Sequence, residues 1–149
     1  MENIKIIARN KKASHEYFFI ETFDCGLVLT GTEIKSIRLG QVSITEAHCQ
    51  VKENELFILD MNIAKFDKGN IFNHEEKRVR KLLAHGKEIK NLSKRVSLEG
   101  LTIIPLELYL ERGLAKIKIT LAKGKKNYDK REDLKQKDIK MAVKKAMKR

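Results

Sequence analysis

The sequence predicts a mainly β protein, namely a small antiparallel barrel of about six strands with about three short helices, followed by a basic tail. In the segment 56–63, Phe57, Leu59, Met61 and Ile63 alternate with Asp60 and Asn62, and residues 115–121 alternate apolar and polar side chains, as strands with one buried face do. Short polar turns join most of the neighbouring strand segments. Six antiparallel strands in roughly 110 residues close most economically as a barrel, because closure removes the exposed edges of an open sheet.

The first strand pair is expected within residues 17–29, where two apolar runs flank a turn at residues 24–26 in the manner of a hairpin. A short helix is expected next. Gly31 or Thr32 is suited to its N-cap, and Gly40 is a typical C-terminal stop signal. We expect this helix to plug or flank the sheet.

A strand over residues 43–51 precedes the alternating strand named above, and a polar turn joins the two. A loop is expected over residues 68–73. Apolar residues then recur at three- and four-residue steps within residues 79–96, which predicts helix. Gly86 and Asn91 are expected to break this segment into two short helices.

The last predicted strands cover residues 101–110 and 115–121, with a turn between them. Pro105 cannot donate a ladder hydrogen bond, so it limits the first of these strands to an edge or a bulge. A shift in composition follows the second strand. We therefore predict two parts, a barrel domain over residues 1–122 and a basic tail over residues 123–149.

Composition limits the classes of protein that the chain can belong to. Charged residues make up 35%, and the formal net charge is +12, so a polyanionic partner is expected. No apolar run approaches the roughly 18 residues of a membrane span, and residues 1–9 lack a signal-peptide core. A cytoplasmic protein without membrane contact is expected. Cys25 and Cys49 are expected to be ordinary reduced thiols.

The histidines and cysteines do not form a pattern typical of catalysis. His48 and Cys49 are adjacent, so in a strand they point to opposite faces and cannot act as a nucleophile and its base. His15, His74 and His85 are scattered, without the spacing of a zinc site. The sequence also lacks a phosphate-binding GxxxxGK loop. We therefore predict no enzymatic activity, no cofactor and no metal.

Three basic clusters favour RNA as the partner: residues 10–15, residues 77–81 and the tail. The tail alone holds 12 Lys or Arg against 4 Asp or Glu, a net +8. Small barrels commonly bind oligonucleotides, and no motif for reading a DNA major groove is present. Lysines would contact phosphates, while His15, Tyr17 and Tyr128 could stack on unpaired bases.

The tail also carries a narrow apolar stripe at helical spacing. The stripe comprises Ile139, Ala142, Val143, Ala146 and Met147. A lone helix of this length is marginal in water, so we expect a tail that is disordered when free and helical when bound to RNA or a ribosomal surface. Two alternatives stay open: a helix that docks permanently on the barrel, and a helix that lies on a membrane surface.

Three separated segments, residues 8–40, 69–89 and 122–133, closely resemble the SsrA-binding protein (SmpB) family, the bacterial partners of transfer-messenger RNA (tmRNA). The segments occur in the family's order and span nearly the whole chain. The resemblance implies an oligonucleotide-binding-type (OB-fold) barrel without catalytic activity. It further implies trans-translation, in which the barrel binds the transfer-RNA-like domain of tmRNA and brings it to stalled ribosomes.

In that family the tail enters the empty messenger channel near the decoding centre and folds as a helix there. The resemblance also implies an indirect partner, elongation factor Tu, acting through the charged RNA, and a monomeric protein. The main rival is a ribosomal or ribosome-assembly protein, which would share every compositional feature. An RNA-processing enzyme is a second rival.

Residue by residue, the resemblance assigns two sets of positions. The tmRNA-binding set is Asn10, Lys11, Lys12, His15, Asp24, Glu33, Lys35, Arg38, Lys81, Leu82 and Leu83. The set for the ribosomal decoding centre is Gly124, Lys125, Lys126, Tyr128, Asp129, Lys130, Arg131, Lys135 and Ile139. Two departures stand out: Asp24 replaces the usual Glu, and Ile139 stands where some relatives carry Trp.

The two carboxylates in the first set have alternative roles. A carboxylate can accept hydrogen bonds from a base amino group or a ribose hydroxyl, and it can also orient a neighbouring Arg or Lys. A purely structural role is equally open. Glu33 would then be a favourable charge at a helix N-terminus, and Asp24 a turn residue.

Overall fold

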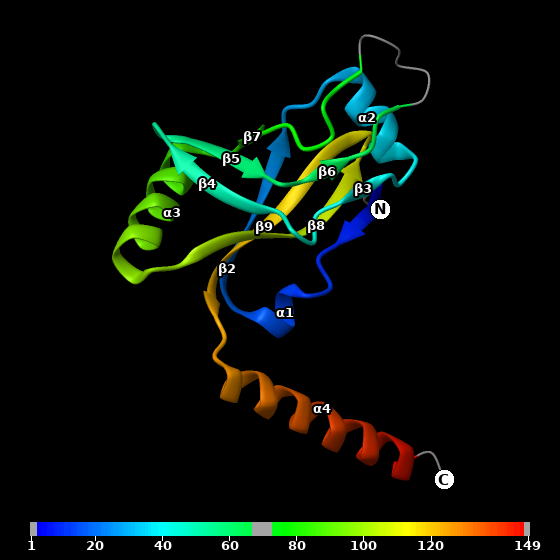
Figure 1. Cartoon of the computed structure of the whole chain (residues 1–149), viewed down its shortest axis with the longest axis vertical. Helices are drawn as coiled ribbons and strands as arrows, with labels where there is room; N and C mark the ends of the chain where they lie inside the picture. Colours follow the sequence, from blue (N-terminus) through cyan, green and yellow to red (C-terminus); the bar gives the residue numbers. More distant parts are fainter. Residues whose placement is uncertain (1–2, 67–72, 148–149) are drawn as a thin grey trace.

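The computed structural model describes residues 3–66 and 73–147, which form a closed antiparallel barrel and a C-terminal helix that projects from it (Figure 1). Going round the barrel, the strands follow the order β8, β4, β5, β7, β2 and β9, and β9 pairs back with β8. Their bounds are Tyr17–Leu27 (β2), His48–Lys52 (β4), Glu55–Leu59 (β5), Arg80–Leu83 (β7), Thr102–Glu111 (β8) and Leu114–Gly124 (β9). The predicted barrel of about six strands is confirmed.

Smaller elements complete the chain. They are β1 (Ile4–Arg9), α1 (Ala13–Glu16), α2 (Gly31–Arg38), β3 (Val42–Ser43), β6 (Asn62–Ile63), α3 (Gly86–Glu99) and α4 (Asn127–Met147). β3 and β6 form a separate two-stranded sheet. β1, which the sequence did not predict, extends the barrel sheet by pairing with the second half of β8. The predicted loop at residues 68–73 lies almost wholly outside the described residues.

The predicted hairpin within residues 17–29 is wrong, because β2 is one continuous strand. It pairs with β9 from Tyr17 to Gly26, so residues 24–26 continue the ladder instead of turning. A Cβ at Gly26 would lie 3.4 Å from the Cβ of Leu83, which is an ordinary van der Waals contact, so strand packing does not require a glycine here. The full-length partner strand overrides the turn preference of Asp and Gly.

The predicted first helix within residues 79–96 is also wrong. Residues Arg80–Leu83 are the strand β7, which bridges β5 and β2. Leu82 pairs with both Leu56 and Leu27 and is buried. Apolar residues do recur at helical spacing here, but pairing with β5 and β2 makes residues Arg80–Leu83 a strand. Downstream, α3 is a single helix that starts at Gly86 and continues through Asn91.

The predicted helix near residue 31 is confirmed as α2, with a shifted start. Its N-cap is Thr30, not Gly31 or Thr32. Gly40 adopts a positive φ of 75° just beyond the helix, and its amide donates to the Ile37 carbonyl at 2.9 Å. The stop signal therefore works as predicted, because glycine accepts the left-handed conformation without a steric penalty.

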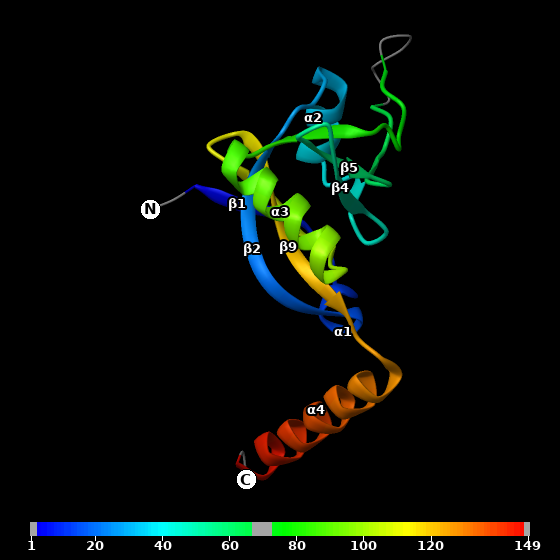
Figure 2. The same ribbon diagram turned by 90° about the vertical axis from the view of Figure 1, so that its left-hand side faces the viewer.

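One hydrophobic core fills the barrel and extends under two helices. Leu108, Ile117 and Ile119 are fully buried in it. Ile37 of α2 and Leu92 of α3 belong to the same cluster. β4 and β8 pair only through Cys49 and Ile103, and α3 packs along both strands (Figure 2). The apolar face of α3 thus covers the weakest seam of the barrel.

The tail is helical here; only its start contacts α1, and the rest projects away from the barrel (Figure 1). β9 ends at Gly124 and α4 begins at Asn127. Ile139 and Val143 of the predicted stripe are about half exposed, so α4 does not dock along the barrel. The side chains of Ala146 and Met147 lie outside the described part. The helical tendency is confirmed, whereas disorder in the free protein stays a prediction. In residues 3–66 and 73–147, no helix is long and apolar enough to cross a membrane.

Candidate nucleic-acid interface

Strand pairing brings distant residues together on the outer face of the barrel. Across β1, β8, β9 and β2, one row of paired residues is Arg9, Glu107, Lys118 and Asp24. The adjacent row, which continues onto β7, is Ile6, Tyr109, Lys116, Gly26 and Leu83. Asp24 and Leu83, both assigned to RNA by the resemblance, therefore lie on neighbouring rows of one face.

Tyr109 holds the carboxylate of Asp24 in place. The Tyr109 hydroxyl donates to Asp24 Oδ1 at 2.9 Å. Tyr109 is 7% exposed, and burial together with this hydrogen bond raises the pKa of its hydroxyl. Asp24 itself is exposed and pairs across the strands with Lys118. Asp24 is thus a fixed acceptor on a strand, not a turn residue, and sequence reasoning gave no sign of its tyrosine partner.

An apolar groove of about 450 Å³ lies beside this face, between α2, β7 and the β8–β9 turn. We call it the α2–β7 groove. Its walls include Leu29, Ile34, Leu83 and Leu114, and the cations Arg38 and Lys116 line it as well. Arg38 and Leu83 were predicted to contact RNA, and the fold places both on the same concave surface.

Glu33 does not lie on the surface. It is fully buried, as are its partner Arg80 and the neighbouring strand residue Leu82. Glu33 accepts hydrogen bonds from Arg80 Nε, from Arg78 Nη2 at 2.6 Å and from the Thr30 amide at 2.8 Å. The prediction that Glu33 and Leu82 contact RNA is corrected, because neither side chain can reach a ligand. Glu33 instead orients arginines, one of the alternatives that the sequence left open.

The ionisation of Glu33 depends on these three donors. Burial by itself would raise the pKa of the carboxyl group, but hydrogen bonds from Arg78, Thr30 and Arg80 outweigh it and lower the pKa to about 2. Arg80 also donates to the carbonyls of Met61 at 2.7 Å and Glu76 at 3.1 Å. The network therefore joins α2 to β7 and to the loop between β6 and β7.

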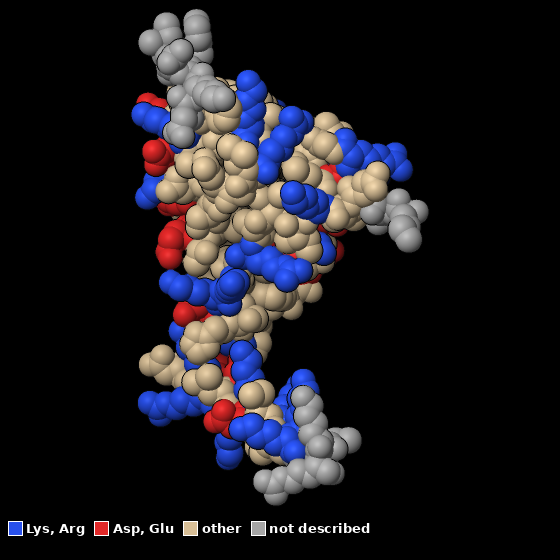
Figure 3. Space-filling model, turned by 90° about the vertical axis from the view of Figure 1, so that its right-hand side faces the viewer, with Lys and Arg blue, Asp and Glu red and all other residues tan. Residues whose placement is uncertain are grey.

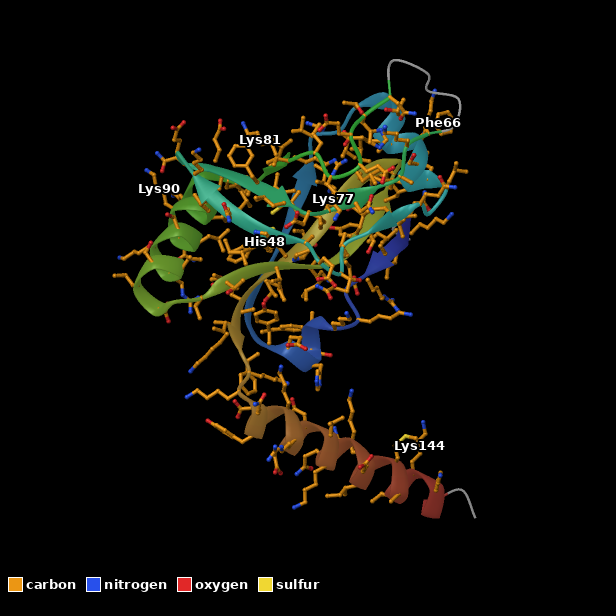
Figure 4. All side chains as sticks on the ribbon, viewed as in Figure 1. His48, Phe66, Lys77, Lys81, Lys90 and Lys144 are labelled. Atoms are coloured by element: carbon orange, nitrogen blue, oxygen red, sulfur yellow. The ribbon has the colours of Figure 1, made fainter. Side chains whose placement is uncertain are left out.

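The exposed side of α2 carries two cations, and the buried Glu33 on the opposite side holds the helix in place. Lys35 and Arg38 are both exposed. The Lys35 ammonium lies 5.3 Å from the centre of the Phe66 ring, beside α2 in Figure 4. Lys81 lies on β7 and pairs with Glu55 at 3.1 Å, where both side chains are partly exposed. Lys35, Arg38 and Lys81 were predicted from the sequence; the first two are exposed and the third is partly exposed.

The cluster at residues 10–15 forms a second surface around α1. Asn10 Nδ2 donates to the Pro105 carbonyl at 3.1 Å, which secures the end of β1 against the bulge in β8. Lys11, Lys12 and His15 are exposed. A cavity of about 480 Å³ near this corner is lined by Asn10 and Lys12 among others, and it shares no lining residue with the α2–β7 groove. The predicted RNA-binding set is therefore divided between two surfaces.

Two exposed aromatic residues were missed by the sequence reasoning. Phe18 and Phe19 on β2 are 42% and 44% exposed, and the Lys125 ammonium lies 4.9 Å from the centre of the Phe18 ring. Tyr17, the predicted stacking residue, is only partly exposed and packs against the small cluster under α1. Both phenylalanines lie in the unbroken apolar run at residues 17–20. The sequence alone does not indicate which of these side chains face the core and which face solvent.

Contacts with α1 fix the start of the tail. Lys125 Nζ donates to the Ser14 carbonyl at 2.8 Å and also pairs with Asp133. Lys130 pairs with Glu16 at 2.8 Å, and its ammonium lowers the pKa of Glu16. Lys125 and Lys130, which were predicted to contact the ribosome, thus bind groups within the protein here. Other residues of the predicted ribosome-binding set are exposed. That exposed set is Lys126, Tyr128, Arg131, Lys135 and Ile139.

Basic side chains dominate the surface that an RNA would meet. Figure 3 shows Lys and Arg spread over one face of the barrel and over the tail, while acidic residues on that face are fewer. Lys144 lies on the distal half of α4 (Figure 4). His48, on β4, has Asp60 as a charged neighbour at 3.7 Å. Among the described residues, no group of three His, Cys, Asp or Glu could hold a metal ion.

A closed six-stranded barrel with a basic outer surface and a basic helical appendage defines a class, the small RNA-binding proteins of the oligonucleotide-binding type. The family model described as "SmpB protein" matches residues 7–149. SsrA-binding proteins of Shouchella clausii and Thermoanaerobacter pseudethanolicus are each 49% identical, over 97% and 99% of this chain and 92% and 94% of their own lengths. The chain belongs to the SmpB family of SsrA-binding proteins.

Other relatives agree with this assignment. The SsrA-binding protein of Bacillus subtilis is 47% identical over 95% of this chain and 91% of its own length. A solved structure described as "tmRNA-SmpB: a journey to the center of the bacterial ribosome" matches with a TM-score of 0.66 and 41% identity. That match covers 80% of this chain and 84% of the other. The curated relatives named above all carry the description "SsrA-binding protein".

Proposed function

We propose that this protein is a non-enzymatic adaptor in trans-translation. It binds the transfer-RNA-like domain of tmRNA and delivers that RNA to ribosomes stalled on messages without a stop codon. The observation that supports this proposal most strongly is the outer barrel face, where Asp24, Leu83 and Arg38 come together from three separate segments. Such a face offers an acceptor, an apolar contact and a cation at once, and folded RNA presents 2′-hydroxyls, unstacked bases and phosphates to such groups.

Two surfaces share the contact with the RNA. Asp24, Lys35, Arg38 and Leu83 contact it through the outer face and the groove, while Glu33 and Leu82 support them from below. The second surface, around α1, comprises Asn10, Lys11, Lys12 and His15, and Lys81 adds a further cation on β7. Two contact surfaces on a rigid barrel would fix the orientation of a bent RNA as well as its affinity.

The tail, residues 123–149, has a separate role. It occupies the vacant messenger channel of the small subunit and stands in for the missing codon–anticodon pairing. Tyr128 is 67% exposed at the start of α4 and stacks on a ribosomal base. The apolar stripe around Ile139 and the flanking lysines contact the channel wall. Lys125 and Lys130 exchange their contacts with α1 for contacts with ribosomal RNA.

The remaining partners follow from this role. Elongation factor Tu acts indirectly, through the charged tmRNA. The protein works as a monomer in the cytoplasm, where ribosomes translate. The barrel of residues 1–122 selects the RNA, and the tail reports on the state of the ribosome.

The first test is the RNA that the protein retains. The affinity-tagged full chain is recovered from bacterial lysate, and the bound RNA is sequenced. Enrichment of tmRNA over transfer RNA is the expected result. Ribosomal RNA without tmRNA would refute the proposal and favour a ribosome-assembly protein.

The second test separates the two parts of the chain. Deleting residues 129–149 is expected to leave tmRNA affinity within a few-fold of the full chain and to abolish peptide tagging on stalled ribosomes. Asp24→Ala is the complementary variant, since it removes an exposed acceptor without touching the tail. It is expected to lower tmRNA affinity. Loss of RNA binding in the deletion variant would contradict the proposed division of roles.

A further inference from the structure

We propose that the seam between β4 and β8 binds an extended, basic segment of a partner protein. The inference goes beyond the proposed function, because it adds a protein contact to the contacts with RNA. Within the residues that the structure describes, β4 and β8 are joined only through the pair Cys49 and Ile103. Next to this pair the facing edges of the two strands have no ladder partner, and an added strand is a common occupant of such an edge.

A groove follows the seam from α1 to α3. Two cavities form it, one of about 480 Å³ next to α1 and one of about 320 Å³ next to α3. Both are lined by His48 of β4 and Thr102 of β8, so the two cavities are continuous, and we call them the seam groove. Figure 4 shows His48 between β4 and β8. The seam groove has no lining residue in common with the α2–β7 groove, so the two surfaces are separate.

The charges of the seam groove disfavour a phosphate and favour a cation. Lys12, Glu16 and Glu46 line its α1 end together with His48. Asp60 lies 3.7 Å from the His48 ring nitrogen and adds a further carboxylate. The described lining of the α3 end contains no Lys, Arg, Asp or Glu. Carboxylates therefore outnumber lysines here, on a protein whose net charge is +12, and this balance suits a segment rich in Lys or Arg.

The α1 end of the groove already binds one lysine of the protein itself. Lys130 of α4 donates to Glu16 at 2.8 Å. Glu46 pairs with Lys12 at 3.6 Å, but both side chains are mostly exposed, so this pair is weak and can exchange. A cation of the partner can therefore take Glu46 while Lys12 contacts a phosphate of the RNA. Protein and RNA contacts are compatible on these terms.

The α3 end of the groove suits small or apolar side chains. Ser93 and Ser97 lie one turn apart on α3, and their small side chains leave the cavity beside the strands open. Their hydroxyl groups and that of Thr102 can each donate to or accept from a peptide main chain. Val51 and Val96 supply apolar contacts. The occupant is thus an extended segment with Lys or Arg at its α1 end and small or apolar residues towards α3.

Peptide selection on the full-length protein tests the proposal. The probe is a bead-bound library of synthetic random ten-residue peptides, and the affinities of the selected peptides are measured by fluorescence anisotropy in the absence of RNA. We expect the selected peptides to carry Lys or Arg near one end, followed by small or apolar residues. Methylation of alternate main-chain amides should weaken their binding, because it removes the hydrogen bonds of an added strand.

Two pairs of variants locate the binding surface. Ser97→Trp fills the α3 end from an exposed helix position, and Leu98→Trp is its matched control, because Leu98 is 74% exposed and does not line the groove. Ser97→Trp should weaken peptide binding about tenfold, whereas Leu98→Trp should bind as the parent does. Glu46→Gln should weaken it about two- to fivefold, and Glu55→Gln, outside the groove, should not.

Three outcomes would overturn the inference and leave the proposed function standing. One is that the parent protein selects no peptide. Another is that Ser97→Trp and Leu98→Trp bind the selected peptides equally well. The third is that the selected peptides are acidic or tolerate main-chain methylation. If the transfer-RNA-like domain of tmRNA displaces the peptides and binds Glu46→Gln more tightly than the parent, the seam groove belongs to the RNA surface and the inference is wrong. Failure of the parent to bind tmRNA would count against the proposed function alone.

Discussion

The replacement Glu33→Gln is the most informative perturbation of this structure, because it keeps the shape of the side chain and removes a buried charge. Glu33 and Arg80 are both fully buried and are bonded to each other. The lowering of the Glu33 pKa from 4.5 to about 2 corresponds to about 3 kcal/mol of stability. Removing one partner from a buried ion pair costs a similar amount, about 3–5 kcal/mol.

The lowered pKa of Glu33 determines how the stability difference between the parent and Glu33→Gln changes with pH. The folded state holds Glu33 ionised more strongly than the unfolded state does, so the contribution is fully present above the unfolded pKa of 4.5. It is lost as the pH falls through the folded pKa of about 2. At pH 7, the free energy of unfolding of Glu33→Gln should therefore be about 3 kcal/mol lower than that of the parent protein. The gap should narrow steadily as the pH is lowered from 4.5 towards 2.

Urea unfolding followed by circular dichroism measures this gap at each pH. Glu55→Gln is the control, since its partner Lys81 at 3.1 Å is partly exposed and the pair contributes less than about 1 kcal/mol. The double variant Glu33→Gln, Arg80→Met should recover part of the loss, because it leaves no buried charge unpaired. A gap below 1 kcal/mol at pH 7, or one that is equally large at pH 3, would refute the reasoning.

Three further predictions follow from other contacts. Burial raises the pKa of Cys25 to about 12, so thiol labelling of the native protein at pH 8 should be slow and should accelerate only under unfolding conditions. Tyr109→Phe removes the donor to Asp24 and should lower the free energy of unfolding by about 1 kcal/mol and weaken RNA binding, as measured by urea titration and gel shift. Glu16→Gln releases Lys130 from α1 and should speed hydrogen exchange in the first turn of α4 without a measurable change in global stability, because the pair is partly exposed and lies at one end of the helix.

The buried network explains why α2 can carry part of an interface. α2 has only eight residues, too few for a stable helix alone. Glu33 anchors its first turn to Arg78 and Arg80 on the distant chain segment that leads into β7. Arg38 thereby lines the groove, and Lys35 is exposed on the same helix beside Phe66. Acidic residues in an RNA-binding family thus serve two different purposes, since Asp24 faces solvent and Glu33 faces the core.

The tail illustrates a different relation between sequence and structure. Its charge and its apolar stripe are local properties, and both predict a basic helix. The contacts of Lys125 and Lys130 with α1 are not local and were not predicted. They hold two of the predicted ribosome-binding cations near the barrel, at the point where α4 leaves it (Figure 2). The side chain of Lys125 is only 8% exposed, whereas the Lys130–Glu16 pair is partly exposed.

The sequence by itself determined the features that depend on local residues and not on which distant segment packs against them. The alternation in residues 115–121 predicts a strand with one buried face wherever it pairs, and Ile117 and Ile119 are indeed fully buried. Gly40 ends α2 as expected, because positive φ is a property of the residue itself. The net charge of the tail needs no fold at all.

Only the tertiary structure decided the features that join distant segments. Residues Arg80–Leu83 became a strand because β5 and β2 lie on either side of them, and β2 is continuous because β9 pairs along its length. Glu33 meets Arg80 across 47 positions, and Asp24 meets Tyr109 across 85. Local propensities amount to tenths of a kcal/mol per residue, whereas burial and pairing of such groups amount to several, so long-range contacts outweigh local preference at these sites.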